Sequence, residues 1–406
     1  MTVRHIVVIG GGPAGVFAAI EAKRRDASAE VTLVSDEPSE PYERPPLSKA
    51  VLLGKARAAD APIAGPKGMA GHGVTLVLHT RCAAIDRAAR EVVTASGRRL
   101  PYDALVIATG SVVRQIPALR LGAPRVHYLR TEAHADALAA ELKAARHLAV
   151  VGGGLIGLEV AASACELGIG VTVIEVAPRI LARVCDEETS AVITQEHRRH
   201  GVDIRLGTGL TDAATASDGR LTLKTSSGDI VHADLVVVGT GATPDDGLAA
   251  AAGLATDNGI VVDAQCRSSD PAIFAAGDVV RFPGPHGLMR QEDWRHAQDQ
   301  GSVAGRNAAG ADDAYRSTPS FWSEQFGLYL QGVGWPQPYP ERRVRRLGAN
   351  MITFEMTGRH IGYAIGINAQ RDMAVVRRLI ERHIAVDPGA LADPTIALAD
   401  LLKAKP

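Results

Sequence analysis

The sequence predicts an α/β protein with two doubly wound domains and a smaller α+β domain at its C-terminal end. Three observations predict this fold class. A short β-branched run, a glycine turn and an alanine-rich segment follow one another twice, from residue 5 and from residue 147. Each of these units then reaches a second β-branched run that ends in an acidic residue, as in a βαβ unit. From residue 321 onward the pattern changes to several strands and one helix, which is typical of an α+β domain.

The order of the expected elements indicates how the domains follow one another. The expected elements are strands at 5–9, 31–34, 147–151 and 171–174, helices at 14–23 and 158–167, strands ending in tight turns at 103–110, 234–241 and 272–278, and, in the last domain, strands at 344–347, 351–355 and 361–367 with a helix at 374–384. We therefore expect a discontinuous first domain (1–117 and 245–320), a second domain inserted into it (118–244) and a third domain (321–406).

The composition is that of a globular protein. The chain has 406 residues, of which 46% are hydrophobic and 22% charged, and its formal net charge is −1. That charge argues against a nucleic acid or an anionic membrane as partner. No apolar run is long enough to span a membrane, and residues 6–9 are too few for a signal peptide, so we expect a cytoplasmic protein.

The cysteines bear on the chemistry. The chain has four, which are Cys82, Cys165, Cys185 and Cys266. They lie far apart, without a Cys-x-x-Cys pair and without the spacing of metal ligands. We expect neither a disulfide framework nor a metal site.

Both glycine turns have the spacing Gly-x-Gly-x-x-Gly. The first glycine of this fingerprint allows a tight turn, the second lets a pyrophosphate approach the backbone, and the third lets the helix pack closely on the strand. The phosphates then lie at the positive end of the helix. One match would be weak evidence, but each of these follows an expected strand and opens an expected helix. The sequence therefore predicts two Rossmann-like dinucleotide sites, formed by Gly10, Gly12, Pro13, Ala14 and Gly15, and by Gly152, Gly154, Leu155, Ile156 and Gly157.

Acidic residues end the second strand of each unit. Asp36 and Glu37 in the first unit and Glu175 in the second are placed to bond an adenosine ribose. An acid there repels a 2′-phosphate, which favours NADH over NADPH, although Arg179 lies close enough to Glu175 to keep NADPH open. The alternative is that these acids only cap the ends of their strands.

Two fingerprints allow FAD with NAD, or two molecules of either. A flavin needs a long groove made by distant segments, and the first domain offers Thr109 with Gly110 and Gly277 with Asp278. The Asp278 carboxylate could bind the ribityl or pyrophosphate part, or the Gly-Asp pair could simply form a turn. We expect FAD at the first fingerprint and a nicotinamide dinucleotide at the second, in an oxidoreductase.

Several longer motifs resemble a known family. They are Tyr-Glu-Arg-Pro-Pro-Leu-Ser-Lys at 42–49, Ala-Thr-Gly at 108–110, Tyr-Leu-Arg-Thr at 128–131, the stretch 152–159, Ala-Gly-Asp at 276–278 and Phe-Trp-Ser-Glu-Gln at 321–325. In this order they are similar to the FAD-dependent bacterial ferredoxin reductases of multi-component oxygenases, among them the reductases of Rieske-type aromatic dioxygenases and putidaredoxin reductase. The resemblance covers essentially the whole chain. It implies a glutathione-reductase-like fold, tightly bound FAD and NADH as co-substrate.

The resemblance also implies residue roles. Lys49 and Arg44 would lie beside the isoalloxazine, and Glu159 would hold the nicotinamide carboxamide. Lys49, Glu159 and Trp322 are the expected catalytic residues; further cofactor contacts are expected from Cys82 at the adenine, Ala108, Arg130 at the FAD pyrophosphate, Arg183 at the NAD adenosine, Gly241, and Glu292, Asp293 and Trp294 along the flavin. The alternatives are a solvated Lys49, a Glu159 that only suits the helix dipole, and a Trp322 that only packs in a core.

The sequence departs from the family pattern at two places. His296 stands where the family usually has an asparagine, which leaves a flavin contact or a helix N-cap in question. The segment 334–346 is unusual, with three prolines and four arginines.

The expected electron acceptor follows from the missing cysteine pair and the resemblance. Without a cysteine pair beside the flavin, electrons must pass to an iron–sulfur partner or a small acceptor. The resemblance implies a small acidic 2Fe–2S ferredoxin that feeds an oxygenase, an aromatic-ring dioxygenase of the Rieske type, with the enzyme a monomer or homodimer. A basic patch could bind this partner or be a solvated face; it consists of Arg342, Arg343, Arg345, Arg346, Arg377 and Arg378.

Two alternative functions remain open at this point. One is an NADH oxidase or small-acceptor reductase on the same fold. The other is a redox-responsive flavin-binding interaction protein.

Overall fold

The computed structural model describes residues 4–285, 287–336 and 338–403. Within these residues the chain forms two compact units. Unit 1 contains residues up to 44, 57–112 and 242–317, and unit 2 contains 45–56, 113–241 and the residues from 318 onward. The short segment 45–56 thus leaves the expected first domain and joins unit 2. The separation of unit 2 into two domains stays a prediction.

A parallel five-stranded sheet forms the centre of unit 1. Its strands, in spatial order, are β19 (Ile273–Ala275), β7 (Ala104–Ile107), β1 (His5–Ile9), β2 (Glu30–Val34) and β3 (Thr75–Val77). The central strands are continuous buried runs of Val, Ile and Leu, which suits parallel strands that are covered on both faces. The carboxyl ends of β1, β7 and β19 therefore meet at one edge of the sheet.

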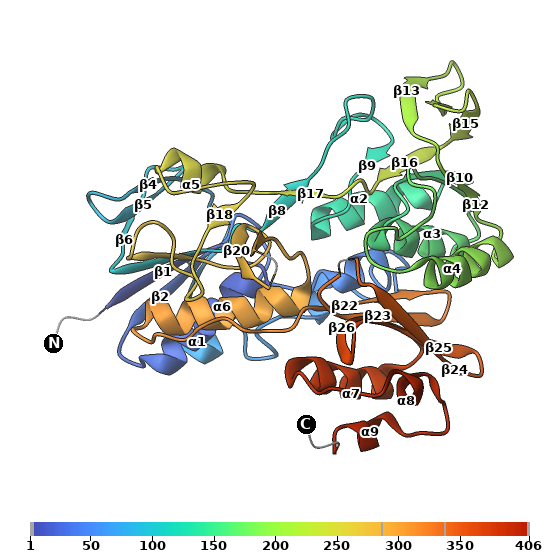
Figure 1. Cartoon of the computed structure of the whole chain (residues 1–406). Helices are drawn as coiled ribbons and strands as arrows, with labels where there is room; N and C mark the ends of the chain where they lie inside the picture. Colours follow the sequence, from blue (N-terminus) through green and yellow to red (C-terminus); the bar gives the residue numbers. More distant parts are fainter. Residues whose placement is uncertain (1–3, 286, 337, 404–406) are drawn as a thin grey trace. The chain divides into compact units, whose positions relative to one another are not determined.

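Helices α1 (Pro13–Arg25) and α6 (Trp294–Ala308) lie side by side in unit 1 (Figure 1). Small residues allow this close approach. A Cβ at Gly301 would overlap the backbone of Ala14, and a Cβ at Gly305 would overlap that of Ala18. Both helices contribute to the core around Val8, Val106 and Phe274. The first half of α1 is consequently packed directly against α6.

The rest of unit 1 consists of short elements. They are an antiparallel sheet of β4 (Cys82–Asp86), β5 (Glu91–Thr94) and β6 (Arg99–Pro101), a sheet of β18 (Ile260–Val261), β20 (Val280–Gly284) and β21 (Gly287–Met289), α5 (Gly247–Ala251), and the 3₁₀ helices η2 (Ala58–Asp60) and η3 (Ala70–His72). The strands β8 (Ser111–Val113) and β17 (Ala242–Pro244) pair where the chain leaves and re-enters the unit.

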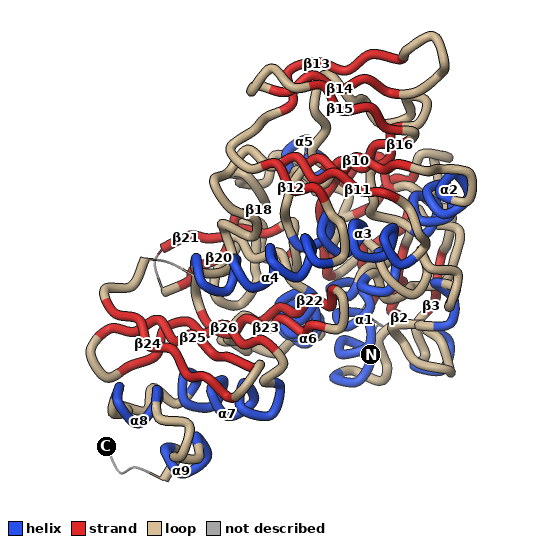
Figure 2. Tube along the Cα trace, turned by 90° about the vertical axis from the view of Figure 1, so that its right-hand side faces the viewer, coloured by secondary structure: helices blue, strands red, loops and turns tan. Residues whose placement is uncertain are grey.

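Unit 2 contains a second parallel sheet of the same kind. Its order is β12 (Asp203–Arg205), β11 (Gly170–Ile174), β10 (His147–Val151), β16 (Leu235–Val238) and β9 (Val126–His127). The helices of this part are α2 (Glu132–Leu142), α3 (Leu155–Glu166) and α4 (Glu187–Arg199). A meander of β13 (Leu210–Thr215), β14 (Leu221–Thr225) and β15 (Ile230–Ala233) adjoins it (Figure 2). The two doubly wound sheets that the repeated pattern predicted are both present.

The C-terminal part of unit 2 is an antiparallel sheet with helices on one face (Figures 1 and 2). The strand order is β22 (Ser320–Gln325), β23 (Leu328–Gly334), β26 (His360–Ile367), β25 (Asn350–Thr357) and β24 (Glu341–Leu347), and the helices are α7 (Gln370–Glu381), α8 (Pro388–Ala392) and α9 (Leu398–Leu401). This part has a hydrophobic core of its own. No helix of the described residues is long and apolar enough to cross a membrane.

Two details of the C-terminal part differ from expectation. The strands β22 and β23 extend the sheet beyond the three strands expected there. The helix expected at 374–384 runs from Gln370 to Glu381. It ends early because His383 adopts a left-handed conformation with φ +49°, which an α-helix cannot contain.

The 3₁₀ helix η1 (Pro45–Ser48) is the remaining element of unit 2. It is tied to α3 because the Ser163 hydroxyl donates a 2.7 Å hydrogen bond to the backbone carbonyl of Ser48. Consecutive prolines open η1, and their fixed φ angles suit a short helical turn. Ser48 and Lys49 are thereby placed beside helix α3 of unit 2.

Candidate functional site

The first glycine turn joins β1 to α1 with the geometry that a phosphate requires. Gly10 has a φ of +115°, and a Cβ there would overlap the carbonyl oxygen of Ala108. A Cβ at Gly15 would overlap Gly10, whereas a Cβ at Gly12 would meet no atom within 4 Å. Within the described residues, no side chain caps the N-terminal N–H groups of α1. We call this open space at Gly12, together with those N–H groups, the first phosphate site.

The second glycine turn, between β10 and α3, repeats this geometry. Gly152 has a φ of +111°, and a Cβ there would lie 2.5 Å from the carbonyl oxygen of Gly239. Gly157 packs directly on Gly152, and the space at Gly154 is again open to 4 Å. Among the described residues α3 has no side-chain cap, although α2 and α4 of the same unit are capped by Thr131 and Asp186. This open space at Gly154, with the free N–H groups of α3, is the second phosphate site.

Further predicted segments meet the first phosphate site at the same sheet edge. A Cβ at Gly277 would lie 2.8 Å from the Cβ of Ala14, so the turn after β19 lies against the start of α1. The Gly277 N–H donates to Gln300 Oε1 over 2.9 Å. Nearby, the Ser111 hydroxyl donates to Asp278 Oδ2 over 3.0 Å. The predicted segments 108–110 and 277–278 thus both lie beside the first phosphate site, and their contacts with a dinucleotide stay a prediction.

The acidic residues after β2 have distinct surroundings. Asp36 is exposed, whereas Glu37 accepts hydrogen bonds from the Tyr42 hydroxyl and, over 2.6 Å, from Arg44. Burial, with the nearby charge of Asp36, raises the pKa of the Cys82 thiol to about 11. Cys82 and Arg44 therefore both lie near the acids expected at the adenosine. The expected place of Arg44 beside the isoalloxazine stays a prediction.

The predicted residues at the start of α6 are held by local contacts. Asp293 caps the helix by accepting a 2.7 Å bond from the His296 N–H, and Glu292 pairs with Arg290. The Trp294 ring meets Phe17 edge to face at 6.1 Å. Burial raises the pKa of Glu43 above its usual value, and a hydrogen bond from Trp294 opposes this effect. These contacts place the start of α6 beside α1, and the predicted flavin contacts stay a prediction.

His296 is a neutral residue of the unit 1 interior. It is 1% exposed, its Nδ1 lies 2.7 Å from the Tyr315 hydroxyl, and its ring stacks on Phe282 at 4.9 Å. Burial lowers the pKa of His296 from 6.5 to about 4. Asp293 is the N-cap of α6, so the histidine leaves the cap intact.

Glu175 is fixed by the backbone around the second phosphate site. Its Oε2 accepts a 2.6 Å bond from the Gly153 N–H, and its Oε1 accepts a 2.7 Å bond from the Ala177 N–H. Arg179 donates instead to the carbonyl oxygens of Cys185 and Ala182, at 2.6 and 3.1 Å. The Arg179 guanidinium, whose nearness to Glu175 in the sequence left NADPH as an alternative to NADH, therefore binds main-chain carbonyl groups.

Other predicted residues surround the second phosphate site. The predicted Ile156 is 47% exposed although it is apolar, and so is Val176, which had no predicted role and is 74% exposed. Arg183 lies beside Gly241, where a Cβ would be 3.9 Å from its Nη2. Exposed apolar side chains and a cation beside free N–H groups suit the adenosine and phosphates of a dinucleotide.

Lys49 and Glu159, two of the three predicted catalytic residues, contact each other in unit 2. Glu159 is only 6% exposed. Its Oε2 accepts a hydrogen bond of 3.0 Å from Lys49 Nζ and one from the Ser48 hydroxyl, and its Oε1 accepts one of 2.6 Å from the Ser323 hydroxyl. Lys49 is therefore no solvated helix start. The structure holds a carboxylate with a defined orientation one turn beyond the second phosphate site.

Trp322 and Arg130 complete the predicted set. Trp322 is partly exposed and precedes Ser323 in β22, so the two side chains point to opposite faces of that strand. Arg130 follows β9 and precedes Thr131, the cap of α2. Both residues belong to unit 2. Their predicted contacts with FAD stay predictions.

Four polar residues of this region had no predicted role. Ser48 and Ser323 donate hydrogen bonds to Glu159. Gln325 donates a hydrogen bond to Ser323 and is itself hydrogen-bonded to His197. The sequence held one sign that Ser323 and Gln325 could act together, because they are two residues apart and hence lie on one face of a strand. Nothing in the sequence indicated that this face is buried.

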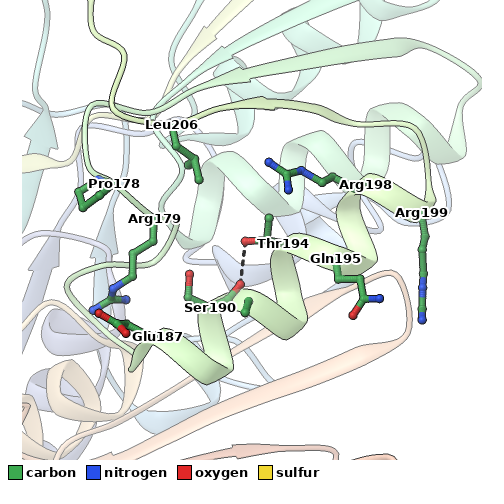
Figure 3. A pocket seen from close by; sticks show the side chains of 10 residues that line it. Pro178, Arg179, Glu187, Ser190, Thr194, Gln195, Arg198, Arg199 and Leu206 are labelled. Atoms are coloured by element: carbon green, nitrogen blue, oxygen red, sulfur yellow. Dashed lines mark hydrogen bonds between the residues drawn. The ribbon is translucent and has the colours of Figure 1, made fainter.

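A cavity of about 690 Å³ lies along α4 (Figure 3). Its lining residues are Pro178, Arg179, Glu187, Ser190, Ala191, Thr194, Gln195, Arg198, Arg199 and Leu206. None of them is a predicted site residue. In this wall the Thr194 hydroxyl donates to the carbonyl oxygen of Ser190 over 2.7 Å.

One member of the predicted basic patch, Arg345, is wrong as a surface charge, and the role of the other five arginines in binding a partner stays a prediction. Arg345 is 3% exposed, and its guanidinium donates to the carbonyl oxygens of Leu391, Asp393, Pro394 and Ile396. It faces inward because neighbouring side chains of β24 point to opposite faces. Ion pairs engage Arg342 with Asp186, Arg346 with Glu188, Arg343 with Glu341 and Arg377 with Glu381.

Comparisons with known proteins agree with this geometry. Residues 4–301 match the family described as pyridine nucleotide-disulphide oxidoreductase, and residues 320–402 match the reductase C-terminal family. The chain is 40% identical over 403 residues to the ferredoxin–NAD(+) reductase component of the p-cumate 2,3-dioxygenase system of Pseudomonas putida, covering 98% of both chains. It is 41% identical over 409 residues to the corresponding component of the anthranilate 1,2-dioxygenase system of Burkholderia cepacia, covering 99% of this chain and 100% of the other.

A solved structure extends the similarity to three dimensions. Putidaredoxin reductase, in its covalent complex with putidaredoxin, superposes with a TM-score of 0.94 and 33% identity, covering 99% of each chain.

Proposed function

The chain belongs to the pyridine nucleotide-disulphide oxidoreductase family, and from this premise we propose that it is an FAD-dependent NADH:ferredoxin oxidoreductase. The observation that carries the proposal is the presence of two phosphate sites of matching geometry, one in each unit. Each has a tight glycine, an open second glycine and a helix start without a side-chain cap among the described residues. This geometry supports two dinucleotides in one chain.

The residues of unit 1 fit FAD. The first phosphate site would bind the pyrophosphate, the acids after β2 would bond the adenosine ribose, and the segments 108–110 and 277–278 would follow the molecule toward its flavin end. Bound FAD supplies hydride acceptance and single-electron release. Tight binding is expected because three segments of one sheet edge converge on this site.

The residues of unit 2 fit NADH. The second phosphate site would bind the pyrophosphate, Glu175 would disfavour a 2′-phosphate, and Glu159 would accept a hydrogen bond from the nicotinamide carboxamide. Hydride transfer needs positioning of the reacting atoms to about 3–3.5 Å and no acid or base from the protein. Lys49 would keep the carboxylate of Glu159 in place and, at the flavin, would stabilise negative charge.

The cysteines do not support a disulfide route. All four are free. Burial raises the pKa of Cys165 to about 11 and that of Cys185 to about 12, so both are poor nucleophiles at neutral pH. Electrons therefore leave to an external acceptor. The names of the relatives support a ferredoxin, and we propose a small acidic 2Fe–2S protein that serves an oxygenase of the Rieske type.

Steady-state kinetics of the purified holoenzyme test this function. NADH oxidation should require a 2Fe–2S ferredoxin or ferricyanide as acceptor, and NADPH should be used at least about tenfold less efficiently. Anaerobically reduced enzyme should transfer electrons to ferredoxin much faster than to dioxygen. Rapid reoxidation by air alone would instead favour an NADH oxidase, and absent turnover with every acceptor would overturn the enzymatic function.

A further inference from the structure

A chain of buried hydrogen bonds connects α4 to Glu159. His197 Nε2 lies 2.8 Å from Gln325 Oε1, Gln325 Nε2 donates to the Ser323 hydroxyl over 2.9 Å, and that hydroxyl donates to Glu159 Oε1 over 2.6 Å. The exposed fractions are 0% for His197, 3% for Gln325, 0% for Ser323 and 6% for Glu159. The members come from α4, β22 and α3, all within unit 2. We call them the His197 relay.

The direction of every bond in the His197 relay follows from the carboxylate. An ionised carboxylate only accepts, so Ser323 must give its hydrogen to Glu159. The Ser323 oxygen then needs a donor, which is the amide nitrogen of Gln325. The amide oxygen of Gln325 faces His197, whose Nε2 must therefore carry the proton.

The state of His197 agrees with this direction. Its Nδ1 is buried and has no hydrogen-bond partner among the described residues, so no neighbour there favours a second proton. Burial also lowers the pKa of His197 below its usual value. The ring is therefore neutral, with its single N–H aimed at Gln325.

The two oxygens of Glu159 have unequal free capacity. Each carboxylate oxygen can accept about two hydrogen bonds. Oε2 has both positions filled, by Ser48 and Lys49. Oε1 has Ser323 as its donor among the described residues, so one position stays available. The available position belongs to the oxygen that the His197 relay orients.

We propose that His197 is a remote positioning residue, which acts through Gln325 and Ser323 to aim Glu159 Oε1 at the carboxamide N–H of the nicotinamide. The inference rests on the proposed function, in which Glu159 contacts NADH. Its physical basis is preorganisation, because a carboxylate that is already oriented loses less conformational freedom when substrate binds. His197 does not touch the substrate.

A purely structural role for His197 would also lower stability when the residue is changed. Its ring meets Phe326 edge to face at 4.9 Å, and the neighbouring His200 stacks on Phe326 at 4.0 Å. Stability alone therefore cannot separate the two roles. The separating quantities are the KM for NADH, the kcat and the response of KM to a variant that keeps the donor.

Matched variants of the holoenzyme provide these quantities. His197→Met removes the N–H, whereas His197→Gln keeps a side-chain N–H that can reach Gln325. With ferricyanide as acceptor, His197→Met should raise the KM for NADH about fivefold, the effect of one lost hydrogen bond, with kcat changed less than about twofold. His197→Gln should stay within about twofold of wild type. Gln325→Met interrupts the relay at the next position and should match His197→Met, which keeps the test available if His197→Met does not fold.

Coupling between positions tests the relay as a unit. Ser323→Ala should raise the KM for NADH, and adding His197→Met to it should raise the KM no further, because both act through one bond. Independent, multiplying effects would overturn the relay. So would an unchanged KM in His197→Met, or equal effects of the Met and Gln variants.

Glu159→Gln separates this inference from the proposed function. If Glu159→Gln raises the KM for NADH and His197→Met does not, the relay is wrong and the role of Glu159 stands. If Glu159→Gln leaves the KM unchanged, the proposed contact of Glu159 with NADH is itself wrong, and the positioning role of His197 is overturned with it.

Discussion

The ammonium group of Lys49 lies 3.0 Å from Oε2 of Glu159, although 110 residues separate the two in the chain. Lys49 follows the short helix η1, and Glu159 lies in α3, the helix that begins at the second phosphate site. Because Glu159 is 6% exposed, its charge needs the donors around it to offset the cost of desolvation. The pair consequently joins the segment 45–56 to the start of the helix expected to bind NADH.

Removing the charge of Lys49 should weaken both stability and NADH binding. Lys49→Met leaves Glu159 with two hydroxyl donors, so we expect a loss of about 2 kcal/mol in the free energy of unfolding and a raised KM for NADH. Denaturant titration and steady-state kinetics measure the two effects. Lys49→Arg keeps the charge and should lose less in both. If Lys49→Met matches wild type in unfolding and in KM, the pair has neither role.

Alanine at Gly154 should impair NADH binding without disturbing the fold. A methyl group there meets no protein atom within 4 Å but takes the place proposed for the pyrophosphate. We expect at least about a tenfold rise in the KM for NADH, with FAD content and Tm unchanged. Chemically reduced enzyme should still pass electrons to ferredoxin at the normal rate.

Gly157→Ala is the matched control for that substitution. Its methyl group would overlap the carbonyl oxygen of Gly152, so this variant should lose thermal stability. A normal KM for NADH in Gly154→Ala would show that the pyrophosphate does not lie at the second phosphate site.

The buried ring of His296 should make stability depend on pH. In the folded protein its pKa is about 4, whereas the ordinary value is 6.5. Between these values the unfolded chain binds more protons than the folded protein, so the free energy of unfolding decreases as the pH falls. From about pH 7 to about pH 5 this residue should contribute a loss of about 2 kcal/mol.

Denaturant unfolding at several pH values, with His296→Asn beside wild type, isolates this effect. The asparagine does not titrate, so its curve should fall less steeply below about pH 6.5. Parallel curves for the two proteins would mean that His296 is not the group responsible.

Arg345 and Arg346 should respond very differently to substitution, although they are neighbours. Arg345→Met leaves the carbonyl oxygens around residues 391–396 without their donor and should cost about 3 kcal/mol or more in the free energy of unfolding. Arg346→Met removes an exposed ion pair with Glu188 and should cost less than about 1 kcal/mol. Denaturant unfolding measures both losses. Similar losses in the two variants would contradict the inward position of Arg345.

The two glycine turns were predictable because their signals are local. Each needs a strand, three glycines at set spacing and a helix within one short segment, and the structure has all of these around Gly10 and Gly152. The strands at 5–9 and 147–151 agree with the sequence residue for residue, since buried parallel strands are continuous apolar runs.

The contacts of Glu159 could not be predicted in the same way. Its donors Ser48, Lys49 and Ser323 come from distant segments, and a serine that bonds a buried carboxylate has no pattern that distinguishes it from a surface serine. The inward position of Arg345 could not be predicted from the sequence either. The run Arg342–Arg343–Val344–Arg345–Arg346 is polar on both faces of its strand, so alternation alone could not show which arginine turns inward.

The contact between α1 and α6 has a consequence for the synthesis of the chain. Ala14 and Ala18 of α1 are covered by Gly301 and Gly305, and β7 gains its neighbour β19 only with residues 273–275. A ribosome that has made the whole of α1 must therefore add nearly three hundred further residues before that face of the helix is buried. During this interval the N-terminal strands and helix cannot reach their final packing, whereas the strands and helices between residues 126 and 238 are already complete. On the ribosome, the parallel sheet of the inserted segment can form first, and the sheet that surrounds it in the sequence must wait for α6 to emerge.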